Sequence, residues 1–79
     1  MMSTNMENIW SYVLAHQNED ITAQDIADAL EIGVKGVCGV ITVSQKLGAT
    51  IREEAIVNGR RVMYIRVVDE KILRRRMTE

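Results

Sequence analysis

The stretch that decides the fold reads TAQDIADALEIGVKGVCGV and runs from Thr22 to Val40. Thr22, followed three residues later by Asp25, is a capping signature, and it predicts a helix over residues 22–31. The apolar residues at helical spacing that would face a core are Ile26, Ala27 and Leu30. A short break follows, and a new apolar pattern begins at Val34. The stretch is therefore expected to form a helix, a tight turn and a second helix.

The composition of the second segment, residues 34–47, is ambiguous. Its β-branched residues favour a strand, and Gly36 and Gly39 each weaken a helix by about 1 kcal/mol. The periodicity favours a helix, since one side of a helical wheel collects Val37, Val40, Ile41, Ser44, Leu47 and Gly48. The opposite side collects Lys35, Gly39, Thr42, Val43 and Lys46. We therefore predict a helix over residues 34–47 that Gly48 stops.

Helices are also predicted near both ends of the chain. Thr4 and Glu7 fit a capping box for a first helix over residues 5–17, and Trp10 is its largest core side chain. Asp69 is placed to cap a short C-terminal helix over residues 69–77. The residues of this helix expected to face inward are Ile72, Leu73 and Met77.

Residues 50–68 predict a β-hairpin around Asn58-Gly59. A two-residue loop would place Ala55 opposite Val62 and mix polar with apolar side chains on each face. An odd loop would place Ala55 opposite Met63 and would put the polar and the apolar side chains on separate faces of the hairpin. We therefore predict a three-residue loop, Asn58-Gly59-Arg60, with Gly59 left-handed and a bulge beside it.

The order helix, helix, tight turn, helix, hairpin resembles that of winged helix-turn-helix regulators, of the MarR-like and phage single-domain kind. Within residues 22–40, a small residue, Ala27, stands where two helices approach, and Leu30 and Ile32 flank the turn. The resemblance covers about residues 5–68. It implies an α+β fold in one domain, residues 1–79, with three helices, a hairpin wing and a short C-terminal helix. Glu31 stands where such turns usually hold glycine, and Gly33 comes two residues later, which predicts a shifted or longer turn.

The resemblance implies a DNA-binding transcriptional regulator. Its recognition helix, residues 34–47, would enter the major groove of double-stranded DNA, and its wing tip would lie on the backbone or minor groove. The DNA-binding residues implied are Lys35, Gly39, Thr42, Val43, Lys46, Arg52, Asn58, Arg60 and Arg61. For Gly36 and Gly39 two roles stay open, a close approach to DNA and packing against the first helices. Arg74, Arg75 and Arg76 would either add phosphate contacts or form a solvated helix face.

The charge is distributed unevenly along the chain. The formal net charge is -1, but residues 1–34 hold six acids and no Lys or Arg. Residues 35–79 hold all ten basic residues and five acids. Such asymmetry is typical of a protein that presents one basic face to an anionic partner, with chance segregation on a solvated surface as the alternative.

Several function classes are not expected. With one His, His16, and one Cys, Cys38, the sequence offers no zinc cluster, no disulfide and no catalytic constellation, so we predict neither an enzyme nor a cofactor. The longest apolar run is four residues, against about 20 for a membrane span, and the N-terminus lacks a basic signal-peptide start. We therefore expect a cytoplasmic protein of a bacterium or a phage-infected host, with no membrane contact.

Two further expectations concern protein partners. The long dimerisation helices of the resembling family are absent, so a homodimer would use the first or the C-terminal helix. The alternative function is that of a winged-helix adaptor, whose acidic first 34 residues would bind a basic protein partner.

Overall fold

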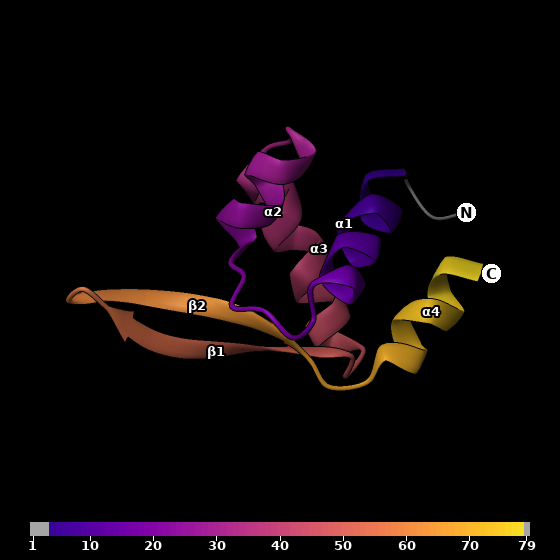
Figure 1. Cartoon of the computed structure of the whole chain (residues 1–79). Coiled ribbons are helices and arrows are strands. Elements are labelled where there is room, and N and C mark those ends of the chain that lie inside the picture. Colours follow the sequence, from indigo (N-terminus) through magenta and orange to yellow (C-terminus); the bar gives the residue numbers. More distant parts are fainter. Residues whose placement is uncertain (1–3, 79) are drawn as a thin grey trace.

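The computed structural model of the protein describes residues 4–78, apart from the side chain of Thr4. Three helices come first: α1 (Thr4–Ala15), α2 (Ala23–Leu30) and α3 (Val34–Lys46). Strands β1 (Thr50–Val57) and β2 (Arg60–Val67) and helix α4 (Glu70–Thr78) follow. This is the predicted α+β order, and every bound lies within two residues of its prediction. Figure 1 shows the helices grouped around the base of the hairpin, whose turn projects beyond them.

One hydrophobic core joins the helices to the base of the hairpin. Trp10 is 1% exposed and is the largest of the fully buried side chains, as predicted. Its indole Nε1 has no hydrogen-bond partner among residues 4–78. Ile65 of β2 and Leu73 of α4 reach the same core, so the strand and the last helix are held to the helices by burial of apolar surface.

The ends of α2 and α4 have the predicted caps. The N–H of Asp25 donates to Thr22 Oγ1 at 3.2 Å, and the N–H of Thr22 donates to Asp25 Oδ2 at 3.0 Å, which completes the capping box. The Asp69 carboxylate accepts the N–H of Lys71 at 3.1 Å. The capping box predicted for α1 rests on the Thr4 side chain and lies outside the described residues.

The turn between α2 and α3 differs from the prediction of a shifted or longer one. Glu31 itself adopts the left-handed conformation, with φ 55°, and caps α2. Gly33 has an ordinary extended conformation with φ -71° and precedes the first residue of α3. The turn keeps its place because Glu31 accepts a backbone conformation that costs a side-chain-bearing residue about 1–2 kcal/mol.

The predicted hairpin loop is wrong. Ala55 pairs with Val62 and Val57 pairs with Arg60, so the loop has two residues, and the pairing of the strands contains no bulge. Asn58 and Gly59 have φ 51° and 75°, which is the pattern of a type I′ turn. The left-handed Gly59 was predicted, but the left-handed Asn58 was not. Most of the β1 side chains are exposed, so a mixture of polar and apolar side chains on each face costs little free energy. The turn therefore decides the register.

Contacts with the segment between α1 and α2 fix the base of β2. The N–H of Ile65 donates to the carbonyl of Ile21 at 2.9 Å. The Arg66 guanidinium donates to Asp20 at 2.7 Å and to Glu53 at 3.1 Å. These hydrogen bonds to Asp20 and then Glu53 raise the pKa of Arg66 above its ordinary value. The Arg66 charge is therefore matched within the chain.

Candidate nucleic-acid interface

Helix α3 divides into the two sides that its sequence predicts. Val37, Ile41 and Ser44 are buried against the core. The opposite side is exposed and consists of Lys35, Gly39, Thr42, Val43 and Lys46. Val43 is the large apolar member of this side, with 39% of its surface exposed.

The two glycines of α3 do not serve packing. A Cβ added at Gly36 or Gly39 would meet no atom within 4 Å. The alternative that these glycines allow α3 to pack against the first helices is therefore wrong. Their effect is to leave the backbone of α3 uncovered on its exposed side, where a ligand can approach closely.

Arg52 of β1 lies against α3. Its Nη1 donates to Gln45 Oε1 at 2.7 Å, and its Nη2 donates to the carbonyl of Cys38 at 3.2 Å and to Thr42 Oγ1 at 3.3 Å. These three acceptors carry no charge, so Arg52 retains an unmatched positive charge beside α3. The sequence predicted Arg52 as a site residue but did not identify Gln45, because their contact forms only where β1 packs against α3.

The hydroxyl of Thr42 is already engaged. It donates to the carbonyl of Cys38 at 2.8 Å, in addition to accepting from Arg52. Its single proton is therefore used within the chain.

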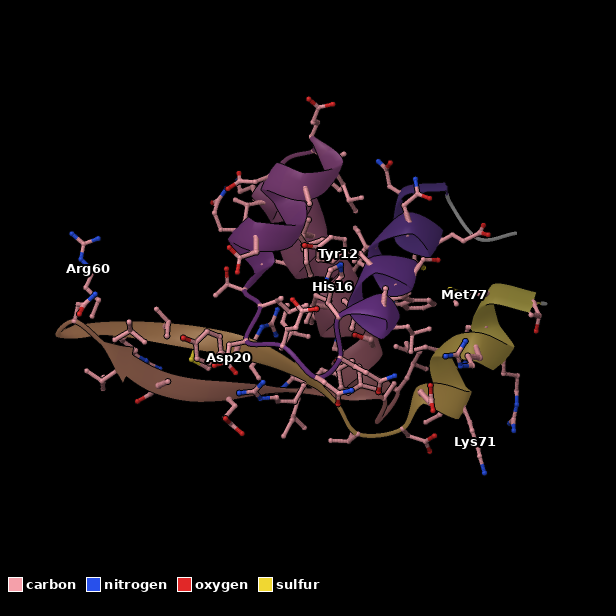
Figure 2. All side chains as sticks on the ribbon, in the orientation of Figure 1. Tyr12, His16, Asp20, Arg60, Lys71 and Met77 are labelled. Carbon is pink, nitrogen blue, oxygen red and sulfur yellow. The ribbon has the colours of Figure 1, made fainter. Side chains whose placement is uncertain are left out.

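The two arginines at the hairpin turn lie on opposite faces of the sheet. Arg61 pairs with Ile56 and shares the face of Arg52, because side chains alternate along a strand. Its Nε lies 2.7 Å from Glu54 Oε2, and both side chains are exposed. Arg60 has no partner in the part of the chain that the structure describes, and Figure 2 shows it projecting from the free end of the hairpin.

The arginines of α4 lie elsewhere. Leu73 is buried in the core, and helix α4 contacts α1; Figure 1 shows α4 beside α1 and away from the hairpin turn. Arg74 Nε donates to Glu70 Oε2 at 3.1 Å. This bond, and then the one from Gln17, lowers the pKa of Glu70 below its ordinary value. Arg75 and Arg76 are exposed.

The remaining candidate groups lie in ordinary surroundings. The His16 ring stacks on Tyr12 with centroids 4.2 Å apart, and its Nδ1 lies 2.7 Å from Glu19. Within residues 4–78, no three His, Cys, Asp or Glu side chains are placed to hold a metal ion. None of the helices in this range has the length and apolar character that crossing a membrane requires.

Solved structures share this arrangement. MepR, a transcription regulator of the Staphylococcus aureus multidrug efflux pump MepA, superposes on 98% of the chain with a TM-score of 0.75 and 22% identity. The chain has the winged-helix fold. The structure of a possible transcriptional regulator from Methanosarcina mazei Go1 also superposes on 98% of the chain, with a TM-score of 0.77 and 13% identity. A complex of MepR with DNA covers 91% of it, with a TM-score of 0.70 and 21% identity.

The chain spans only part of the length of these solved structures. It spans 56% of MepR, 65% of the Methanosarcina protein and 50% of the MepR chain in the DNA complex. No protein-family model and no curated protein matches its sequence.

Proposed function

We propose that the protein is a DNA-binding transcriptional regulator that places α3 in the major groove and the tip of its wing, the β1–β2 hairpin, on the backbone or minor groove. The observation that carries this proposal is the uncovered side of α3. Lys35 and Lys46 lie on it about 16 Å apart along the helix axis. The major groove is about 12 Å wide, so these lysines would reach phosphates on its two sides while Gly36 and Gly39 let the backbone approach the bases.

The placement of unmatched charge supports the same face. Arg66 and Arg74 are engaged by carboxylates, whereas Lys35, Lys46 and Arg52 have no carboxylate partner among the described residues. The proposed DNA-binding residues are Lys35, Gly39, Thr42, Val43, Lys46, Arg52, Asn58, Arg60 and Arg61. The near-neutral net charge is compatible with this role, since the field at the binding face matters more than the total.

The proteins of similar fold also support the proposal. MepR is a transcription regulator, and its structure has been solved with DNA. Because the chain spans only part of MepR, the proposal concerns the winged-helix unit itself. A homodimer through α1 or α4 and phosphate contacts by Arg74, Arg75 and Arg76 are further parts of it.

Fluorescence anisotropy with a random-sequence duplex pool at two salt concentrations tests this function. We expect binding that weakens with salt, and a loss of about tenfold or more when Lys35 and Lys46 are both changed to Ala. Lys71→Ala is the matched control, because Lys71 is an exposed lysine of α4, away from the wing tip in Figure 2. Absence of binding to every duplex, or an equal loss with Lys71→Ala, would contradict the proposal.

A protein-interaction adaptor is the second candidate. It is favoured by the first 34 residues, where all six acids are exposed. Capture of a basic protein partner that is unaffected by changes at Lys35, Lys46 and Arg60, together with no binding to any duplex, would favour it over DNA binding.

A further inference from the structure

The contact between Arg52 and Gln45 determines which end of the Gln45 side chain faces outward. A guanidinium group has only N–H donors, so the atom of Gln45 that faces Arg52 must be the amide oxygen. Its distance to Arg52 Nη1 is 2.7 Å. The Nε2 group of Gln45 is consequently turned away from Arg52, and it makes no hydrogen bond within residues 4–78.

Arg52 is itself held at the edge of α3. Its Nη2 donates to the carbonyl of Cys38 and to Thr42 Oγ1, and its Nη1 to Gln45. These acceptors follow at intervals of four and three residues, so they line one edge of the helix. To reach a phosphate, Arg52 would have to give up hydrogen bonds to three residues of α3.

We propose that Gln45 reads the edge of a base pair in the major groove as a hydrogen-bond donor, and that Arg52 is the positioning residue that holds its carboxamide. This inference rests on the proposed DNA-binding function. Gln45 is exposed and precedes Lys46, on the helix that the proposed function places in the major groove. Thr42, whose hydroxyl proton is used within the chain, is the other polar uncharged side chain of this surface.

The chemistry of the outward NH₂ group sets the expected preference. Guanine presents the acceptors O6 and N7 in the major groove, and thymine presents O4. Cytosine presents an amino donor there, which cannot accept from Gln45. One position of the binding site is therefore expected to favour guanine or thymine over cytosine by about fivefold, as one hydrogen bond supplies.

The test uses the full chain. A preferred duplex is selected from a random pool, and affinities are measured for it and for duplexes substituted at each position. Gln45→Ala and Arg52→Ala are both expected to lose the same preference, at the same base pair, and the double variant to lose no more than either. Lys71→Ala is the control, an exposed lysine of α4 away from the hairpin turn, and it should leave both the affinity and the preference intact.

The salt dependence separates positioning from direct phosphate contact. Arg52→Ala should leave the slope of log affinity against log salt unchanged. A slope reduced by about one, with affinity lowered equally for all duplexes, would make Arg52 a phosphate contact and overturn the inference. Base preferences that Gln45→Ala leaves unchanged would overturn it too. Failure to bind any duplex would refute the proposed function instead.

An NMR measurement without DNA distinguishes a positioning role of Arg52 from a general loss of structure in the Arg52 variant. In the wild-type protein the Gln45 side-chain amide should be ordered on the picosecond to nanosecond scale, with an NMR order parameter above about 0.6. Arg52→Lys keeps the charge but cannot reach three acceptors at once, and it should lower that parameter while the core signals stay in place. Equal mobility of the Gln45 amide in both proteins would contradict the positioning role.

Discussion

The hydroxyl oxygens of Ser44 and Thr50 lie 2.8 Å apart inside the core, where the last turn of α3 meets the first residue of β1. Ser44 also donates to the carbonyl of Ile41 at 2.8 Å. Because a serine hydroxyl has one proton, Thr50 is the donor to Ser44. With the Arg52 contacts, this buried bond ties the wing to α3.

The direction of the Ser44–Thr50 bond predicts unequal costs. Ser44→Ala leaves the Thr50 proton without an acceptor and should lower the free energy of unfolding by about 1–3 kcal/mol. Thr50→Val removes the donor alone and should cost about 1 kcal/mol. The double variant should cost less than the sum, as measured by urea denaturation. Additive costs would show that the two hydroxyls are not bonded.

Replacing Glu31 with glycine should stabilise the protein. Glu31 holds φ 55°, a conformation that glycine adopts without steric penalty. The change relieves that steric strain, but glycine also has more conformational entropy in the unfolded chain, which offsets part of the gain. The net effect should be to raise the free energy of unfolding by about 0.5–1 kcal/mol. Glu31→Ala is the control, since it removes the charge and keeps the Cβ. A glycine variant no more stable than the alanine variant would refute this explanation.

Changing Glu54 to Gln should strengthen DNA binding under the proposed function. Glu54 shares the hairpin face of Arg52 and Arg61, and it neutralises Arg61 at 2.7 Å. The change should raise affinity, because Arg61 then no longer has to give up Glu54 when it contacts a phosphate. Glu53→Gln makes the same charge change on the opposite face, where Glu53 contacts Arg66, and it should have a smaller effect. Equal gains from both variants would point to net charge alone.

The Glu70 carboxylate should add stability that depends on pH. Its pKa is lowered in the folded protein, so its contribution is present above the ordinary value of 4.5 and is lost as the pH falls through the folded value. Wild type should therefore be more stable than Glu70→Gln at pH 7, and the difference should disappear in acid, as followed by thermal unfolding. In an Arg74→Gln background most of the difference should already be absent at pH 7, and its persistence there would contradict the assignment to Arg74.

The helices could be predicted because their signals are local. Ile26 and Val37 stand at helical spacing, Thr22 with Asp25 marks a helix start, and all four are where the pattern placed them. The exposed side of α3 followed from the same periodicity. These features depend on residues within a few turns of each other, which a sequence displays directly.

The parts that could not be predicted depend on contacts between elements or on a choice between close energies. The rule that gathers apolar side chains on one face failed in the hairpin, where Ile51 lies opposite Arg66, because most of the β1 side chains are exposed. Gln45 was missed because its contact with Arg52 forms only where β1 packs against α3. Glu31 was misjudged because a residue other than glycine can adopt the left-handed conformation at the end of a helix, as Glu31 does with φ 55°.

The most direct test of DNA binding through α3 and the wing is the affinity for a duplex as a function of salt. If Lys35, Lys46, Arg60 and Arg61 each neutralise one phosphate, log affinity should fall against log salt with a slope of about -4. Changing Arg60 and Arg61 to Ala should reduce the magnitude of that slope by one to two. A slope near zero, or one that the double variant leaves unchanged, would contradict DNA binding by this face.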